Sequence, residues 1–299
     1  MRDVPGRQVP VNGRTVYAEE TGQGQHRVVF ESGGGCGRTC WDPVLPLLAG
    51  AARLVAYDRA GRALSGPATR QLSIDDMAAD LVAMTEAIVP GEFVLVAHSM
   101  GGLVARRAAG RLGSRLRGLL LADILPETSP VYDTWDQTTK KIDRMLAVTQ
   151  PLSRFRPLAR LFTGNIRHLY PADTYQAMLA EDFTPAGISQ TRKEMQAVAA
   201  AIPQFHAQPP RLPECPVIVL SVARAAKGRE RQLAANREHQ RRYAGSLRHG
   251  RYEVVDSAHL IQAEQPQLLA TRIQELLQAT AWPTSCSLGP GTRTGRDAG

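Results

Sequence analysis

Short apolar runs alternate along the chain with longer segments in which apolar residues recur every three or four positions. An apolar run bounded by turn signals is typical of a buried strand, and such runs occur at 27–31, 53–58, 93–97, 116–123, 215–222 and 252–255. The clearest helix begins at Ser73–Asp76, a capping-box-like start, and carries along one face Ile74, Met77, Leu81, Met84 and Ile88. This alternation predicts an α/β fold: a doubly wound, mostly parallel sheet with helices on both faces.

The first predicted element is a β-hairpin at residues 9–18. Asn12-Gly13 separates two strand-like segments, 9–11 and 14–18. Asn-Gly favours a tight two-residue turn because both residues tolerate positive φ. We therefore expect two antiparallel strands there.

The pattern changes between residues 125 and 212. Helical stretches rich in Met, Leu and Ala are interrupted by Pro130, Pro151, Pro157, Pro171, Pro185 and Pro203, with no strand-like run among them. We predict a helical lid over the sheet at 125–212, with the core formed by 1–124 and 213–282. Residues 283–299 are rich in Gly, Pro and Thr and are expected to be disordered, because they offer little apolar surface to bury.

The most informative stretch is Phe93–Leu103, where an apolar strand turns sharply into a helix with Ser99 at the apex. A serine on such a bend requires small residues two positions before and after it, and here they are Ala97 and Gly101. Met100 follows the serine at the start of the helix, where backbone N–H groups are unpaired. An oxyanion would be favoured at this position.

These residues resemble the G-x-S-x-G nucleophile elbow of the α/β-hydrolase superfamily, with Ala97 in place of the first glycine. Ser32–Gly37 is similar to the superfamily's loop that completes the oxyanion hole, although Ser32 replaces its histidine. The resemblance implies that the N–H groups of Gly34 and Met100 hold the oxyanion. The segment 57–65 resembles a turn of the same superfamily, in which Asp58 has a structural part.

The resemblance also implies a base and an acid for Ser99. His259 lies between the last strand and a helix that begins near Pro266, where the superfamily places its catalytic histidine. The usual position for the acid, after the strand at 215–222, lacks a carboxylate until Glu230. Asp123, at the end of the strand after the elbow helix, occupies the other known position and is the preferred acid, with Glu230 and then Asp256 as alternatives.

The implied activity is that of a serine hydrolase acting on a carboxylic ester of a small or medium apolar acyl compound. Serine at the apex disfavours epoxide hydrolase or dehalogenase chemistry, which uses a carboxylate nucleophile in related folds. Two alternatives stay open. One is an amide or peptide hydrolase with the same triad, and the other is a non-catalytic ligand-binding protein on the same fold.

Composition changes this picture little. The 299 residues carry a net charge of +8, and the excess of arginine lies in 106–117, 140–167 and 224–251, which we interpret as solvated helix faces. No interleaved aromatic residues or binding signature indicate a nucleic-acid partner. The four cysteines and the histidines form no metal-ligand pattern, and no cofactor is expected. No stretch is long enough to span a bilayer and the amino terminus is polar, so a cytoplasmic location is predicted.

Overall fold

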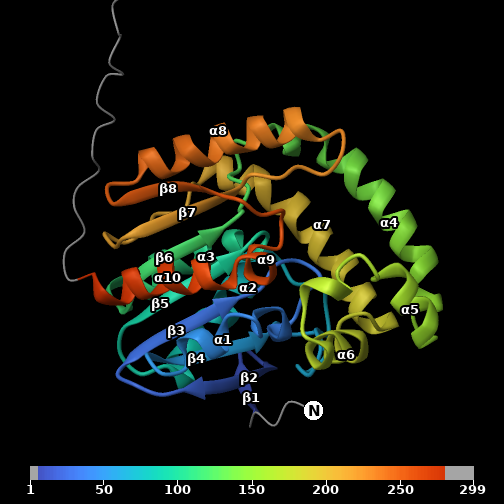
Figure 1. Cartoon of the computed structure of the whole chain (residues 1–299), viewed down its shortest axis with the longest axis horizontal. Helices are drawn as coiled ribbons and strands as arrows, with labels where there is room; N and C mark the ends of the chain where they lie inside the picture. Colours follow the sequence, from blue (N-terminus) through green and yellow to red (C-terminus); the bar gives the residue numbers. More distant parts are fainter. Residues whose placement is uncertain (1–5, 280–299) are drawn as a thin grey trace, which may run out of the picture.

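The structure is a computed structural model that describes residues 6–279, and it contains an eight-stranded sheet ordered β1-β2-β4-β3-β5-β6-β7-β8 (Figure 1). The strands are β1 (Gly6–Val11), β2 (Arg14–Gly22), β3 (His26–Glu31), β4 (Ala52–Asp58), β5 (Phe93–His98), β6 (Leu116–Ala122), β7 (Val217–Val222) and β8 (Gly250–Val255). The pairs β1–β2 and β2–β4 are antiparallel, and the other neighbours are parallel. The predicted mostly parallel sheet is confirmed, whereas the tail predicted at 283–299 lies outside the described residues.

Helices cover both faces of this sheet, as predicted. The helices are α1 (Leu45–Leu48), α2 (Ile74–Ile88), α3 (Gly101–Leu112), α4 (Trp135–Leu152), α5 (Arg156–Phe162), α6 (Ala172–Glu181), α7 (Pro185–Ala207), α8 (Glu230–Ser246), α9 (Ile261–Glu264) and α10 (Pro266–Gln278), with 3₁₀ turns η1 (Arg38–Trp41), η2 (Gly113–Arg115), η3 (Pro130–Thr134) and η4 (Arg167–Leu169). Residues of α2, α3 and α8 join one hydrophobic cluster, and residues of α1 and α10 join the other. The sheet therefore lies between two helical layers.

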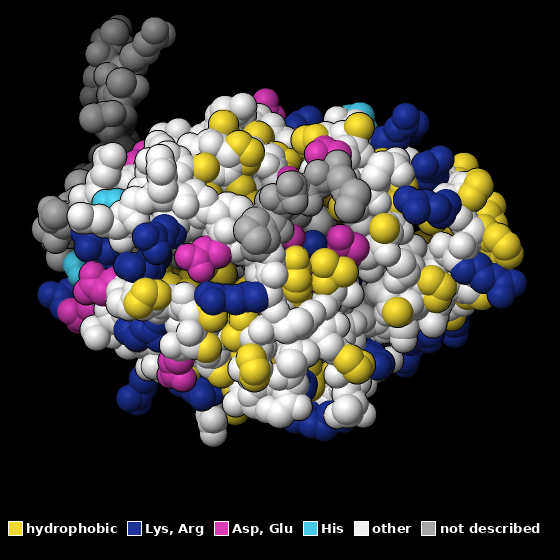
Figure 2. All heavy atoms as spheres, turned by 90° about the horizontal axis from the view of Figure 1, so that it is seen from below, with side chains coloured by type: hydrophobic (Ala, Val, Ile, Leu, Met, Phe, Trp, Pro, Cys, Tyr) yellow, Lys and Arg dark blue, Asp and Glu magenta, His cyan; other side chains and the backbone are white. Residues whose placement is uncertain are grey.

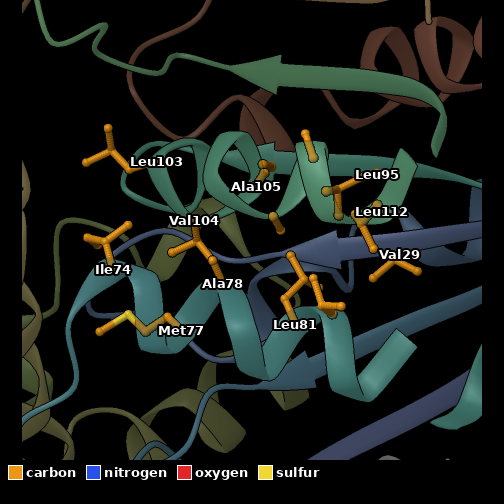
Figure 3. Packing of buried hydrophobic residues seen from close by; sticks show 14 of the residues in the cluster. Val29, Ile74, Met77, Ala78, Leu81, Leu95, Leu103, Val104, Ala105 and Leu112 are labelled. Atoms are coloured by element: carbon orange, nitrogen blue, oxygen red, sulfur yellow. The ribbon is translucent and has the colours of Figure 1, made fainter. Parts of the chain in front are cut away.

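The central strand β5 shows why a strand of a parallel sheet has a continuous run of apolar residues in its sequence. Phe93, Leu95 and Ala97 belong to the cluster beneath α2 and α3, while Val94 and Val96 belong to the cluster beneath α10. Successive side chains point to opposite faces of a strand, so both sets must be apolar when both faces are buried. Figure 3 shows Leu95 beside the interlocked side chains of α2 and α3.

Two local predictions are also confirmed. Asn12 and Gly13 both have positive φ, 44° and 75°, and they connect β1 to β2. At α2, the Ser73 side chain accepts a hydrogen bond from the N–H of Asp76, and the Asp76 carboxylate accepts one from the N–H of Ser73. Each of these features depends on residues adjacent in sequence, which is why the pattern alone was sufficient.

Between β6 and β7 the described chain forms helices α4 to α7, with 3₁₀ turns and no strand. We call residues 125–212 the helical insertion. Its prolines correct one expectation: Pro151 and Pro203 lie inside α4 and α7 and do not end them. Both lie near the carboxyl-terminal end of a helix. Pro130, Pro157, Pro171 and Pro185 lie at or near the starts of helices or 3₁₀ turns, where a missing N–H costs little.

The expectation that the basic segments lie on solvated helix faces is wrong for Arg106. Arg106 is only 2% exposed. Its guanidinium lies over the rings of Phe205 and Tyr243 and forms an ion pair with Glu127. A guanidinium can be buried when aromatic faces and a carboxylate replace its water. The charge pattern of α3 alone does not reveal these partners, because they come from segments distant in sequence.

Candidate active site

Ser99 is the first residue after β5 and directly precedes the turn into α3. Its φ is 51°, a left-handed conformation that is rare for residues other than glycine. Its N–H nevertheless continues the sheet ladder by donating to the carbonyl oxygen of Ala122, at 3.0 Å. The strand thus presents the serine at the carboxyl edge of the sheet, on the strained bend that the elbow pattern requires.

Gly101 is required by packing on this bend. A Cβ at residue 101 would lie 2.5 Å from the carbonyl oxygen of Ser32 and 2.8 Å from that of Glu31, both of them backbone atoms. We expect Gly101→Ala to lower the free energy of unfolding by about 1–3 kcal/mol, measured by urea denaturation. The matched control is Gly245→Ala in α8, where an added methyl meets no atom within 4 Å. This substitution is expected to be neutral or stabilising, so equal losses in both variants would contradict the packing argument.

The structure brings together three side chains from distant segments at the edge of the sheet. The Nε2 atom of His259 lies 3.1 Å from Oγ of Ser99, and its Nδ1 atom lies 2.7 Å from Oδ2 of Asp123. An ionised carboxylate only accepts hydrogen bonds, so Nδ1 carries the proton and Nε2 is free to accept from the serine hydroxyl. The order hydroxyl, imidazole, carboxylate is that of a nucleophile, its base and the group that orients the base.

Asp123 and His259 differ in their exposure to solvent, but their mutual hydrogen bond decides the direction of both pKa shifts. The side chain of Asp123 is 12% exposed and that of His259 is 54% exposed. Partial removal from water lowers the pKa of His259, but the hydrogen bond and charge of Asp123 outweigh this effect and raise the pKa overall. Burial raises the pKa of Asp123, but hydrogen bonds from His259 and Gln240 lower it overall, so the carboxyl stays ionised.

Asp123 reaches His259 because it occupies the same kind of position as Ser99. It is the first residue after β6, its φ is 44°, and its N–H donates to the carbonyl oxygen of Leu220 at 2.8 Å. Of the alternative acids, Glu230 begins α8 on the surface and accepts a hydrogen bond from the N–H of Gly228. Asp256 has an 85% exposed side chain and pairs with Arg224. Neither of these two is placed against His259.

Gln240, a fully buried residue of the mostly polar helix α8, was not predicted from the sequence. Its Nε2 atom donates to Oδ1 of Asp123 at 3.0 Å and to the carbonyl oxygen of Ile124 at 2.7 Å, while Ser221 donates to its Oε1 atom. Gln240 therefore holds the carboxylate oxygen that His259 does not use. A glutamine in a basic amphipathic helix carries no recognisable signal in the sequence.

His98 also has a part that the sequence did not suggest. It is buried, its Nε2 atom donates to the carbonyl oxygen of His259 at 2.8 Å, and the two imidazole rings lie 4.7 Å apart. Burial and the neighbouring charge of His259 lower the pKa of His98 to about 3, so the ring stays neutral. His98 thus supports the loop that carries the base.

Gly34 and Met100, the two residues expected to donate to an oxyanion, are neighbours in the structure. A Cβ at Gly34 would lie 3.4 Å from Sδ of Met100, and one at Gly33 would lie 3.4 Å from Cβ of Ser99. The loop after β3 reaches the elbow because β3 and β5 are adjacent parallel strands. Met100 directly precedes α3, so its N–H is among the unpaired amides of that helix start.

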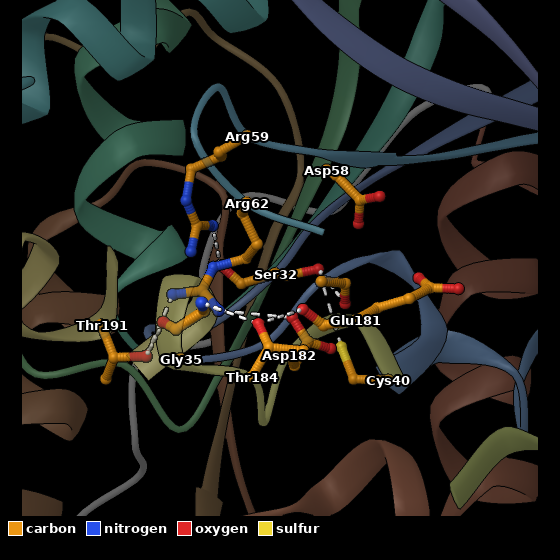
Figure 4. A network of polar contacts seen from close by, with 12 residues as sticks. Ser32, Gly35, Cys40, Asp58, Arg59, Arg62, Glu181, Asp182, Thr184 and Thr191 are labelled. Carbon is orange, nitrogen blue, oxygen red and sulfur yellow. Dashed lines mark hydrogen bonds and ion pairs between the residues drawn. The ribbon is translucent and has the colours of Figure 1, made fainter. Parts of the chain in front are cut away.

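A buried network of charges lies behind this loop and joins it to the helical insertion (Figure 4). Arg59 donates to the carbonyl oxygens of Ser32 and Gly33, at 2.6 and 2.8 Å. Glu194 of α7 accepts from the N–H of Gly35 at 2.9 Å and also pairs with Arg59 and Arg62. Burial disfavours the charge of Glu194, but the two arginines outweigh this and lower its pKa to about 2.

Beside His259 the surface is hollowed by a pocket of about 300 Å³ between the loop after β7 and α8. It is lined by Arg224, Arg229, Leu233 and Ala258, among others. Within residues 6–279 no group of three or more His, Cys, Asp and Glu side chains is placed to hold a metal ion. No helix in this part of the chain is both long and apolar enough to cross a membrane.

Comparison with known proteins agrees with the fold. A sequence profile of the Alpha/beta hydrolase family matches residues 28–272. Two curated relatives are a 2-heptyl-3-hydroxy-4(1H)-quinolone dioxygenase of Mycobacteroides abscessus, 30% identical over 40% of this chain, and the non-heme chloroperoxidase CPO-A1 of Kitasatospora aureofaciens, 33% identical over 38%. These matches span 45% and 42% of the relatives' own lengths, less than half of each.

Among solved structures, a Nostoc sp PCC 7120 protein described as an alpha/beta hydrolase is similar over almost its whole length. The TM-score is 0.75, with 22% identity, and the alignment covers 93% of this chain and 99% of that one. Likeness at this level of identity concerns the fold.

Proposed function

Since the chain belongs to the Alpha/beta hydrolase family, we propose that it is a serine hydrolase that cleaves a carboxylic ester through an acyl-enzyme on Ser99. The observation that carries this proposal is the hydrogen-bonded succession of Ser99, His259 and Asp123, with contacts of 3.1 and 2.7 Å. A weak nucleophile such as a serine hydroxyl needs a base within hydrogen-bonding distance, and the base needs an orienting partner.

The proposed reaction has two halves. In the first, Oγ of Ser99 bonds to the ester carbonyl carbon while its proton passes to Nε2 of His259, and the N–H groups of Gly34 and Met100 hold the oxyanion. The carbon–oxygen bond to the alcohol then breaks, and His259 returns the proton to the departing alkoxide. In the second half, water attacks the acyl-enzyme with the same base, and the carboxylic acid leaves. The helical insertion acts as a lid that covers the acyl group.

The test is labelling with a fluorophosphonate together with a screen of p-nitrophenyl esters of increasing acyl length. We expect the label on Ser99 and turnover of short or medium acyl chains. Folded protein that neither labels nor turns over an ester would favour the binding-protein alternative. Comparing matched ester and amide substrates separates esterase from amidase or peptidase activity.

The acid limb of the pH profile follows from the pKa of His259. The base must be neutral to accept a proton, so kcat/KM is expected to rise with pH through this pKa. Because Asp123 raises the pKa above the ordinary 6.5, the limb should lie above pH 6.5. Asp123→Asn removes the negative charge that raises the pKa of His259, so the acid limb should move to lower pH. Initial rates across buffers of constant ionic strength measure the position of the limb. An acid limb that does not move in Asp123→Asn would contradict the pairing of His259 with Asp123.

Oxygenation of a hydroxyquinolone is a second candidate, because the relative from Mycobacteroides abscessus is named as a dioxygenase of such a compound. In that case the His259–Asp123 pair would remove the proton of the substrate's acidic hydroxyl, and dioxygen would be the second substrate. Oxygen uptake with 2-heptyl-3-hydroxy-4-quinolone tests this candidate. Its signature would be activity that survives Ser99→Ala and is lost in His259→Ala.

A further inference from the structure

The outer surface of α4 and α5 combines exposed apolar side chains with a concentration of positive charge. Of the eight large hydrophobic residues that are exposed in the described chain, five lie between 145 and 162: Met145, Val148, Phe155, Leu161 and Phe162, with exposures from 43 to 73%. We call this surface the α4–α5 face. Figure 2 shows hydrophobic side chains gathered at the end of the molecule that Figure 1 assigns to these helices, beside Lys and Arg.

The apolar and basic side chains share the outward side of α4. Lys141, Arg144, Met145 and Val148 are all exposed and are spaced at three, four and seven positions, so they lie on one side of the helix. The helix has no buried residue along its 18 positions, although it packs against α7. A helix in this position would ordinarily turn its apolar residues inward, so their exposure indicates a surface with a partner.

The charge of the α4–α5 face identifies the chemistry of that partner. Residues 135–167, from the start of α4 to the turn after α5, contain seven Lys and Arg and two acidic residues, Asp136 and Asp143. Asp143 is already neutralised by Arg192, with contacts of 2.7 and 3.0 Å. The seven cations, all exposed, are Lys140, Lys141, Arg144, Arg154, Arg156, Arg160 and Arg167. The partner must therefore present negative charge around an apolar interior.

We infer that the α4–α5 face docks onto an anionic lipid surface. The apolar side chains would enter the boundary between headgroups and acyl chains, while the long Lys and Arg side chains reach the phosphates. A second copy of this chain is a poor occupant, because a symmetric pair would bring the same seven cations against each other. Docking would bring the helical insertion, which lies at the carboxyl edge of the sheet, next to the lipid.

The test is co-sedimentation with two kinds of vesicle, phosphatidylcholine alone and phosphatidylcholine with phosphatidylglycerol. We expect binding to the anionic vesicles that weakens with salt, and little binding to the neutral ones. The variant Arg154→Gln/Arg156→Gln/Arg160→Gln should bind the anionic vesicles about tenfold or more weakly. Phe155→Ser/Leu161→Ser should also bind weakly, with a smaller salt effect on what remains.

Matched controls are Leu47→Ser, which removes an exposed apolar residue from α1, and Arg248→Gln, which removes an exposed cation on the loop before β8. Both should bind as the wild type does, and circular dichroism checks that every variant is folded. Absence of binding to anionic vesicles would overturn the inference, as would equal losses in the controls. Self-association that depends on Phe155 and Leu161, or binding to an acidic peptide without binding to anionic vesicles, would assign the face to another partner and equally overturn it.

The contacts of the loop that carries Gly34 support a second proposal, which rests on the proposed function. Gly33 O and Gly34 N–H belong to one trans peptide group, because the described residues contain no cis bond, and so they point in opposite directions. Arg59 holds Gly33 O at 2.8 Å, and Glu194 holds Arg59 at 3.1 Å and the N–H of Gly35 at 2.9 Å. We propose that Arg59 and Glu194 are positioning residues that aim the Gly34 N–H at the oxyanion.

Glu194→Gln tests this second proposal, since it keeps the size of the side chain but removes the charge that holds Arg59. We expect kcat to fall by about tenfold or more with little change in KM, because an oxyanion donor acts in the transition state. Affinity for a boronic acid, which mimics the tetrahedral oxyanion, should fall in parallel. Asp182→Asn is the control, since Asp182 pairs with Arg62 in the same network but does not contact Arg59 or Gly35.

The outcomes separate this proposal from the proposed function. Wild-type protein without esterase activity would remove the proposed function itself. If the wild type is active and Glu194→Gln keeps the wild-type kcat and boronate affinity, the positioning role is overturned while the proposed function stands. If Glu194→Gln does not fold, Arg59→Lys replaces it: the charge stays but the forked donor is lost, and the same split of kcat from KM is expected. Equal kcat losses in Asp182→Asn would indicate a merely structural network and also overturn the role.

Discussion

Ser99→Ala is expected to lower kcat for ester hydrolysis by about a millionfold, the size of loss found when the nucleophile of a Ser-His-Asp triad is removed. The substitution deletes the only atom that bonds to the acyl carbon, while Gly34 and Met100 still provide N–H donors. Residual turnover would then come from water attack on a substrate held in that site. Initial rates with a p-nitrophenyl ester, and the absence of a fluorophosphonate label, measure the effect.

The free energy of unfolding should change little, because alanine and serine have a similar conformational energy at the φ of 51° adopted by residue 99. Ser246→Ala at the exposed end of α8 is the matched control and should retain full activity. A Ser99→Ala protein that keeps its turnover while His259→Ala loses it would refute the acyl-enzyme. It would point instead to a reaction that needs only the base.

Asp123→Asn is expected to lower kcat by about ten-thousandfold, and the reason lies in the tautomer of His259. Gln240 donates a hydrogen bond at 3.0 Å to Oδ1 of Asp123, so an asparagine there would turn its carbonyl oxygen toward Gln240. Its NH₂ group would then face Nδ1 of His259 and would place the imidazole proton on Nε2. In that tautomer Nε2 has no lone pair to accept the proton of Ser99.

The matched control is Glu230→Gln, since Glu230 lies on the surface and does not contact His259. Its kcat should stay within about twofold of wild type, as is usual for surface substitutions away from a site. Comparable losses in the two variants, or a negligible loss in Asp123→Asn, would remove Asp123 from the reaction. Rates at several pH values separate a lost base from a shifted pKa.

Several features of the fold could be predicted because they depend on residues that are close together in the sequence. The Asn12–Gly13 turn, the Ser73 cap of α2 and the apolar run of β5 each depend on a few consecutive residues, and all three are present as expected. The buried strands were recognisable because both faces of a parallel strand are covered. The small residues on either side of Ser99 likewise indicate a local bend in the backbone.

The acid could not be decided in the same way. Asp123 was only the preferred candidate, with Glu230 and then Asp256 as alternatives, because the loop after β7 carries no carboxylate before Glu230. In the structure β6 is the neighbour of β5, so the first residue after β6 emerges one strand away from Ser99. Which of two carboxylates reaches an imidazole is a matter of strand order, and strand order does not appear in a run of apolar residues.

The amino-acid pattern was therefore enough to establish the class of fold and the strained serine, since short-range sterics and hydrophobic periodicity produce them. The segment that carries His259 was recognised by its resemblance to the superfamily. The partners of buried charges were settled by long-range packing: Gln240 on Asp123, Glu194 on Arg59, and Arg106 between Phe205 and Tyr243. A buried charge or amide must find its hydrogen bonds wherever the folded chain provides them. Those partners come from segments that only the packing of helices onto the sheet brings together.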